Sequence, residues 1–382
     1  MQTPETDYKD QTGEFVSKFI YATPKWKLIA SLITISLLKS GIWFMPNTGV
    51  SLLIAQNPFA NPFPDWPEAQ YLYWSWLGPF LAWCIGATRS WSFLGFHFAF
   101  AVLFTALFVW VIFSRFPDRE ARTAFVLFTV LPVSMTPYFW LSMDSLTLFL
   151  MVSALALRKI WPLTLLVGVA LGMQHFEQGF CAATVLLVAI IMSKYLHDQA
   201  EYSLSWTLSL LAGVVLGKLV LFELFLHWHV AVNSGRLFWL LQHRNLLLAE
   251  FYDHFQYVLY SVFGVGWLFV IKYGEKGKKA LPLFIGILGV LLLLPISADQ
   301  TRVSSIASFL LIAVFCLLNS TFLASLSKRF SSWLLLTWFI APYAWVWQGT
   351  PKWSILPYDI ELLLHKALGW FSVPANKALW PF

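Results

Sequence analysis

Charged residues are scarce in this 382-residue chain: Asp, Glu, Lys and Arg together make up only 12% of it. Hydrophobic residues account for 59%, and the mean hydropathy is +0.68. Soluble domains contain about 25% charged residues, so this composition excludes an ordinary soluble protein. It predicts an all-α integral membrane protein, because a helix satisfies its own backbone hydrogen bonds inside the bilayer.

Cysteine is nearly absent as well. Cys84, Cys181 and Cys316 each lie within an apolar run and lack the spacing of a metal site or a redox pair. Disulfides and thiol chemistry are therefore not expected. The first 25 residues are polar and contain no short apolar core followed by a cleavage site of small residues, so a cleaved signal peptide is not indicated.

Apolar runs of a length suited to a bilayer recur along the chain. Residues 1–348 are predicted to form one polytopic transmembrane domain, and residues 349–382 an external C-terminal tail. The domain is expected to contain about 11 transmembrane helices, at 27–45, 91–113, 123–140, 143–157, 160–174, 179–193, 204–226, 255–271, 280–297, 303–324 and 332–348.

Basic residues are divided unequally between the two sets of connections. A cytoplasmic N-terminus places 16 of the 25 Lys and Arg residues on the cytoplasmic side and seven on the external side. This asymmetry follows the positive-inside rule. The net charge of +6 is thus mainly a topology signal, and no basic groove indicates nucleic acid as a partner.

The first external stretch, residues 46–90, is too long for a simple turn and too apolar for a free loop. Its segment WLGPFLAWCIGA (76–87) predicts an interfacial or re-entrant helix, because it is too short for a full crossing. The surrounding Trp and Tyr residues are typical of a belt at the headgroups. Such a belt does not explain Asp65 and Glu68 of FPDWPEAQ, whose prolines should hold both acids on a stiff loop.

Other polar clusters also fall on the external side. They are FWLSMDS (139–145), MQHFEQG (173–179), the long stretch 227–255 and SADQTR (297–302). A transporter usually carries polar groups near the midplane and on both faces. Clustering at one face favours an enzyme that acts on a lipid-linked substrate.

The order of these motifs resembles the GT-C superfamily of polytopic glycosyltransferases. PDWPEAQY followed by LGP is similar to the first loop of its small mannosyltransferase-like members, although this chain has D-x-x-E where many relatives have D-E or D-x-D. DSLTL (144–148), HFE (175–177) and DQTRV (299–303) resemble further recurring stretches. The resemblance implies transfer of a sugar, with inversion, from a polyprenyl-phosphate-linked donor to a glycan or lipid acceptor. The reaction would take place at the external face of a multi-pass protein, which is expected in a bacterial plasma membrane.

Such a transfer needs a base for the acceptor hydroxyl and a cation for the departing phosphate. Asp65 is predicted to be the base, with Glu68 as the second choice; capping of a helix is the alternative role. Arg302 and Arg244 are predicted to bind the lipid phosphate, since guanidinium groups match phosphate oxygens; snorkelling to headgroups is their alternative. The other predicted binding residues are His243, Arg236, His175, Glu177 and Asp299.

No cofactor is certain from the sequence. His175 and Glu177 would need further ligands to hold a metal ion, and no clear third ligand is present, so a divalent cation is left open. Asp144 is predicted to be the N-cap of a span.

Two other functions stay open. A transporter or flippase of lipid-linked glycans or small solutes would use Lys39, Lys218 and Glu223, which lie in or near spans. If these three line one continuous cavity, transport is favoured; if they pair locally, it is not. A polysaccharide ligase or polymerase would depend less on an acid in the first loop.

The predicted orientation can be checked by labelling. Single cysteines introduced at Lys278 and Asn61 in a cysteine-free background should react with an impermeant reagent from opposite sides of the membrane, because the basic connections stay in the cytoplasm. Reaction of both from the same side would contradict this orientation.

Overall fold

The structure is a computed structural model that describes residues 11–43, 47–196, 202–230, 232 and 236–354. It is 80% helical and therefore nearly all-α, as the composition predicts. Within the described ranges, five helical segments are long and apolar enough to cross a membrane. They are Ser90–Arg115, Trp161–Tyr195, Leu204–His227, Phe255–Ile296 and Gln300–Leu317. The chain is thus a membrane-embedded helical protein.

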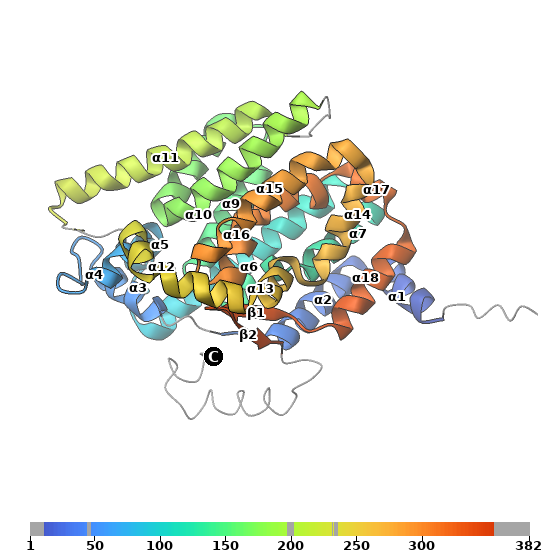
Figure 1. Cartoon of the computed structure of the whole chain (residues 1–382), viewed down its shortest axis with the longest axis horizontal. Coiled ribbons are helices and arrows are strands. Elements are labelled where there is room, and N and C mark those ends of the chain that lie inside the picture. Colours follow the sequence, from blue (N-terminus) through green and yellow to red (C-terminus); the bar gives the residue numbers. More distant parts are fainter. Residues whose placement is uncertain (1–10, 44–46, 197–201, 231, 233–235, 355–382) are drawn as a thin grey trace, which may run out of the picture.

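The elements follow one another as helices with a single strand pair near the end (Figure 1). The first half contains α1 (Gln11–Ala22), α2 (Lys25–Ser40), α3 (Asn47–Gln56), α4 (Pro67–Gln70), η1 (Tyr71–Trp74), α5 (Leu77–Cys84), α6 (Ser90–Arg115), α7 (Asp118–Val130), η2 (Pro132–Ser134), α8 (Thr136–Phe139), α9 (Asp144–Ala156) and α10 (Trp161–Tyr195).

The second half is similarly rich in short helices. It contains α11 (Leu204–His227), α12 (Arg236–Asp253), α13 (Phe255–Phe263), η3 (Gly264–Gly266), α14 (Trp267–Tyr273), η4 (Gly274–Ala280), α15 (Leu281–Leu291), η5 (Leu294–Ile296), α16 (Gln300–Ile312), η6 (Ala313–Leu317), α17 (Ser320–Ser325), α18 (Lys328–Ile340), β1 (Ala344–Trp347) and β2 (Thr350–Trp353).

Element α10 reverses direction at His175, whose φ of −161° and ψ of 81° are not helical. A Cβ atom on Gly179 would lie 2.8 Å from the side chain of Leu171. Residues eight apart in a straight helix are separated by about 12 Å along the axis, so the two parts of α10 must run antiparallel. They correspond to the spans predicted at 160–174 and 179–193.

Glycines hold the first arm of α10 against α11. A Cβ atom on Gly168 would lie 2.9 Å from Cα of Gly213, and one on Gly172 would lie 3.1 Å from Cα of Gly217. Both pairs advance by four residues together, so this arm and α11 run parallel. Small residues permit such a close approach of two backbones within a membrane.

Several predicted spans differ from the structure. The span 255–271 contains a break at Gly264, whose φ is 53°, and the span 303–324 is broken between η6, which ends at Leu317, and α17, which begins at Ser320. The span 123–140 is interrupted, since α7 ends at Val130 and Pro132 opens η2; proline lacks the backbone N–H that would continue the helix. The span 332–348 is wrong at its end, where α18 stops at Ile340 and residues 344–347 form β1. The first part of the predicted tail belongs to β2, which pairs antiparallel with β1, and residues 355–382 lie outside the described ranges.

The described part of the stretch predicted to be external, residues 47–90, contains α3, α4, η1 and α5. The short helix predicted at 76–87 is present as α5, Leu77–Cys84. Tyr73 and Trp76 both donate hydrogen bonds to the carbonyl oxygen of Pro58, at 2.5 and 2.7 Å, and so fasten this stretch to itself.

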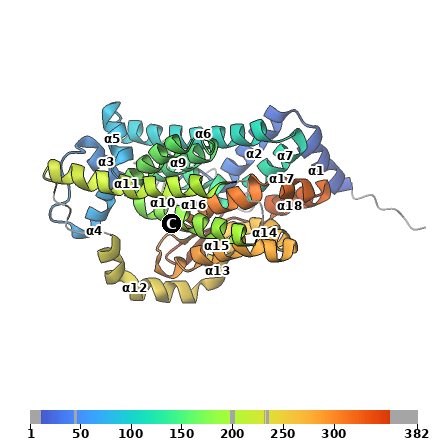
Figure 2. The same ribbon diagram turned by 90° about the horizontal axis from the view of Figure 1, so that it is seen from above.

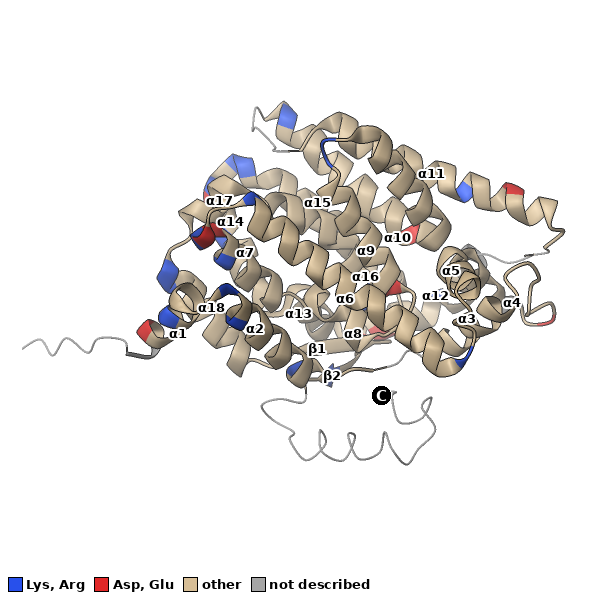
Figure 3. Ribbon diagram, turned by 180° about the vertical axis from the view of Figure 1, so that it is seen from behind, with Lys and Arg blue, Asp and Glu red and all other residues tan. Residues whose placement is uncertain are grey.

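Basic residues gather at one end of the molecule, around α1, α7, α14, α17 and α18 (Figure 3). Helix α12 lies along the side opposite α6 (Figure 2). The charge segregation therefore separates a basic end from the end at which the predicted external stretches lie.

Lys39 joins the ends of α2 and α18. Its Nζ is buried and donates hydrogen bonds to the carbonyl oxygens of Trp338, Phe339 and Ala341 at 2.7, 3.1 and 2.6 Å. These carbonyls end α18 and have no partner within the helix, and a cation at this end also opposes the helix dipole.

Lys39→Met should therefore lower the free energy of unfolding by about 2–3 kcal/mol, because it leaves buried carbonyl groups without their donor. Thermal unfolding of the purified protein would measure the change. The matched variant Lys27→Met, on the exposed face of the same helix, should melt at the parental temperature. Equal stability of both variants would contradict the role given to Lys39.

Candidate functional site

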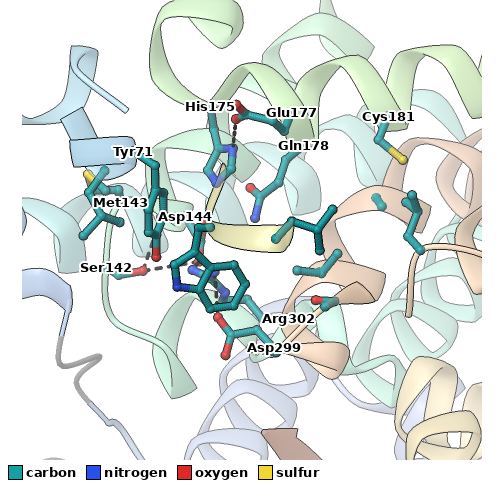
Figure 4. A pocket seen from close by; sticks show the side chains of 18 of the residues that line it. Tyr71, Ser142, Met143, Asp144, His175, Glu177, Gln178, Cys181, Asp299 and Arg302 are labelled. Carbon is teal, nitrogen blue, oxygen red and sulfur yellow. Dashed lines mark hydrogen bonds and ion pairs between the residues drawn. The ribbon is translucent and has the colours of Figure 1, made fainter. Parts of the chain in front are cut away.

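A cavity of about 530 Å³ lies where the predicted external stretches meet (Figure 4). Its walls come from η1, the start of α9, the turn of α10, α12, η5, the start of α16 and the turn between β1 and β2. The stretches 46–90, 227–255 and 297–302, all predicted to lie on the external side, contribute residues to it.

An ion-pair cluster forms the floor of the cavity. Arg302 in α16 lies 2.9 Å from Asp144 in α9 through Nη1, and 2.7 Å from Asp299 through Nη2. Asp144 is 1% exposed and Asp299 is 5% exposed. Ser142 donates a further hydrogen bond of 3.3 Å to the carboxylate of Asp144. Buried charges require such pairing, because an isolated charge in a low dielectric is very costly.

The turn of α10 supplies His175, Glu177 and Gln178 to one wall (Figure 4). Nδ1 of His175 lies 3.6 Å from Oε2 of Glu177, whose side chain is 38% exposed. The non-helical backbone of His175 reverses the chain at this point. The reversal brings these polar residues to the end of two apolar arms.

Aromatic and apolar side chains complete the lining. Tyr71 of η1, Trp239 of α12 and Trp347 of β1 face the cavity. The wall between the second arm of α10 and α16 is apolar, with Cys181, Leu293, Ile296, Val303 and Ala307. The cavity therefore joins a polar floor to an apolar side.

Two hydrogen bonds hold the turn of the strand pair against this site. The backbone N–H of Gln348 donates to the carbonyl oxygen of Ala298 at 2.7 Å, and that of Val346 donates to the hydroxyl of Thr301 at 2.9 Å. Gln348 and Gly349 both have positive φ, of 46° and 75°. A two-residue turn with two positive φ values suits the twist of a hairpin.

The structure brings four of the predicted binding residues together in this cavity: His175, Glu177, Asp299 and Arg302. Arg302 was predicted to bind the lipid phosphate, and in the structure both of its terminal nitrogens contact carboxylates. Asp144 was predicted to be an N-cap, but Met143 holds that position and the Asp144 carboxylate contacts Arg302 instead.

The other predicted residues lie elsewhere or outside the described atoms. Asp65 is exposed on the turn before α4 and is not among the lining residues, and the side chain of Glu68 lies outside the described part. On α12, Arg244 is exposed, and Nδ1 of His243 lies 2.8 Å from the carbonyl oxygen of Trp239. Arg236 is the first residue of α12, and its side chain is also outside the described part.

Sequence reasoning missed Asp144, Gln178 and the three aromatic residues as parts of the site. One signal was available for Asp144. An acid at the start of an apolar span is costly unless a cation is near, and Arg302 starts another span on the same predicted side. No comparable signal identified Trp239 or Trp347 among the 21 tryptophans of the chain.

The three residues named for a transport pathway do not share this cavity. Lys39 is bound to the end of α18, and Nζ of Lys218 lies 3.5 Å from the ring centroid of Trp74. Glu223 is exposed on α11. Within the described residues, no group of three or more His, Cys, Asp or Glu side chains could hold a metal ion.

Comparison with known proteins identifies no relative. No protein-family model matches the sequence, and neither a curated protein nor a solved structure is significantly similar to it.

The ion-pair cluster makes a stability prediction. Arg302→Gln should lower the free energy of unfolding by about 3–5 kcal/mol, because it leaves two buried carboxylates without their cation. Thermal unfolding would measure this loss, and Arg329→Gln at an exposed position of α18 is the control.

A triple variant tests the cause. Adding Asp144→Asn and Asp299→Asn to Arg302→Gln should recover part of the lost stability, since the repelling charges are then gone. If the triple variant is less stable than Arg302→Gln alone, charge pairing is not what holds these residues together.

Proposed function

We propose that this protein is a membrane glycosyltransferase of the GT-C type. It would move a sugar from a polyprenyl-phosphate-linked donor to an acceptor hydroxyl of a glycan or lipid, with inversion at the anomeric carbon. The observation that carries the proposal is the cavity itself, in which carboxylates, an amide and aromatic rings lie beside an apolar wall. Specific polar groups in a largely apolar cavity are typical of small-molecule sites.

The proposal includes a topology of about 11 spans, with the N-terminus in the cytoplasm and the cavity at the external face. The gathering of basic residues at the opposite end supports this orientation (Figure 3). The reversal within α10 supports counting it as two spans. Helix α5 would lie at the interface or re-enter the membrane.

The residues of the cavity suit a lipid-linked sugar. Carboxylates and amides accept hydrogen bonds from sugar hydroxyls, and the rings of Trp239 and Trp347 offer apolar faces to a sugar ring. The wall of Leu293, Ile296 and Val303 offers apolar surface to the lipid.

Glu177 is the base in this proposal. Its carboxylate is partly exposed at the edge of the cavity, beside His175, where an acceptor from outside would arrive. Asp144 and Asp299 are poorer candidates for the base, because both carboxylates are already paired with the guanidinium of Arg302. Asp65, the base predicted from the sequence, lies on an exposed turn outside the lining.

The reaction is a direct displacement. The acceptor oxygen forms a bond to the anomeric carbon, its proton passes to Glu177, and the bond from that carbon to the phosphate oxygen breaks. The products are the glycosylated acceptor and polyprenyl phosphate. Binding of this phosphate would fall to α12, where Arg236 lies three residues before the lining residue Trp239, and Arg244 lies further along.

The test is an assay of the purified full chain with a panel of polyprenyl-phosphate sugars and extracted membrane glycans as acceptors. Release of polyprenyl phosphate together with a labelled acceptor is expected for at least one sugar. Movement of intact lipid-linked sugar across a vesicle membrane, without release of phosphate, would overturn the proposal in favour of transport.

Variants test the assignment of the base. Glu177→Gln should slow transfer by at least about a hundredfold, the usual contribution of a positioned general base, while the melting temperature stays at the parental value. Asp65→Asn and Glu68→Gln should transfer sugar at close to the parental rate. If Asp65→Asn is the slow variant instead, the base lies in the first external stretch, as the sequence resemblance implies.

A further inference from the structure

We infer that Gln178 selects the sugar in this cavity, by exchanging hydrogen bonds with a hydroxyl pair or an amide of an uncharged sugar. The inference rests on the proposed function and names its substrate class. Gln178 is 5% exposed, lines the cavity and points into it (Figure 4). Neither Oε1 nor Nε2 of this side chain has a hydrogen-bond partner among the residues that the structure describes.

A second buried glutamine on the same turn shows what a structural role requires. Gln174 is 0% exposed and lies four residues before Gln178. Its Oε1 accepts a hydrogen bond of 2.7 Å from the backbone N–H of Gly78, and its Nε2 donates one of 2.9 Å to the carbonyl oxygen of Met143. Gln174 therefore fastens the turn of α10 to α5 and α9, whereas Gln178 fastens nothing in the described structure.

An unpaired buried amide is costly to the protein. Nearly all buried polar atoms have a partner, and the exceptions call for an explanation such as a bound ligand. Gln178 offers one acceptor and two donors from a single planar group. Adjacent hydroxyls of a sugar, or an acetamido group, offer the matching donor and acceptor.

The charged residues that line the cavity further restrict the class of sugar that it should bind. Among the described lining residues there are three carboxylates, Asp144, Asp299 and Glu177, and one guanidinium, Arg302, which already contacts two of them. A uronic acid would bring a fourth carboxylate into this low-dielectric site and would be repelled. A neutral sugar meets no such repulsion, so the site should accept neutral hexoses and N-acetylhexosamines and reject their uronates.

The experiment uses farnesyl phosphate esters of glucose, mannose, galactose and N-acetylglucosamine, and the matching uronates of the three hexoses. Their affinities for the purified full chain are read from tryptophan fluorescence, because Trp239 and Trp347 line the cavity. At least one neutral sugar should bind, and at least about tenfold more tightly than its uronate. Gln178→Leu should weaken its binding by about tenfold, the range of a lost hydrogen bond or two.

The melting temperatures of two glutamine variants distinguish a role of Gln178 in ligand recognition from a structural role. Gln178→Leu should melt at or above the parental temperature, because it removes unpaired polar atoms from a buried position. The matched variant Gln174→Leu should melt lower, since it leaves Gly78 and Met143 without partners. A melting temperature of Gln178→Leu that falls with that of Gln174→Leu would overturn the inference.

Three other results would also overturn it: no binding by any sugar of the panel, equal binding of a hexose and its uronate, or parental affinity in Gln178→Leu. The proposed function fails separately. Selective binding without transfer would contradict the transferase but uphold the role of Gln178, whereas transfer at the parental rate and affinity by Gln178→Leu would contradict only that role.

Discussion

The contact of Arg302 with Asp144 and Asp299 is the interaction on which the rest of the site depends. It joins α9 to α16 through Asp144 and Arg302, which are 158 residues apart in sequence, at a place where both carboxylates are buried and the arginine side chain is 12% exposed. An unpaired charge at this buried position would cost several kcal/mol of folding free energy. The pairing therefore favours the arrangement in which the start of α9 lies beside the start of α16. The cavity, its floor and the attached strand turn all take their places from this meeting.

The second constraint is the reversal of α10 at His175. The glycine contacts fix the position of its first arm along α11. Gln174 then hydrogen-bonds the backbone of Gly78 in α5 and of Met143, the residue before Asp144. His175, Glu177 and Gln178 therefore reach the cavity on a turn that is held at three places. The position of the polar turn thus depends on the packing of the first arm of α10 against α11.

The sequence predicted the parts of the structure that depend on local composition. Apolar runs located most helices, and the polar connections on one predicted side do meet in space. It could not predict contacts between residues that are distant in the chain. Residues 344–347 are as apolar as a span but pair with β2, Arg302 contacts two acids, and Asp65 is exposed outside the cavity lining. No spacing within the chain reveals that Asp144 and Arg302 are partners.

The cluster also constrains any reaction in this cavity. Because Arg302 is already neutralised by two carboxylates, a departing phosphate bound there would have to displace an acid or tolerate its repulsion. The sugar, in contrast, gains from acceptors on the floor. In the proposed reaction the sugar therefore lies over the floor, and the phosphate stays toward α12. Inversion by direct displacement requires that Glu177 and the phosphate lie on opposite sides of the anomeric carbon in this arrangement.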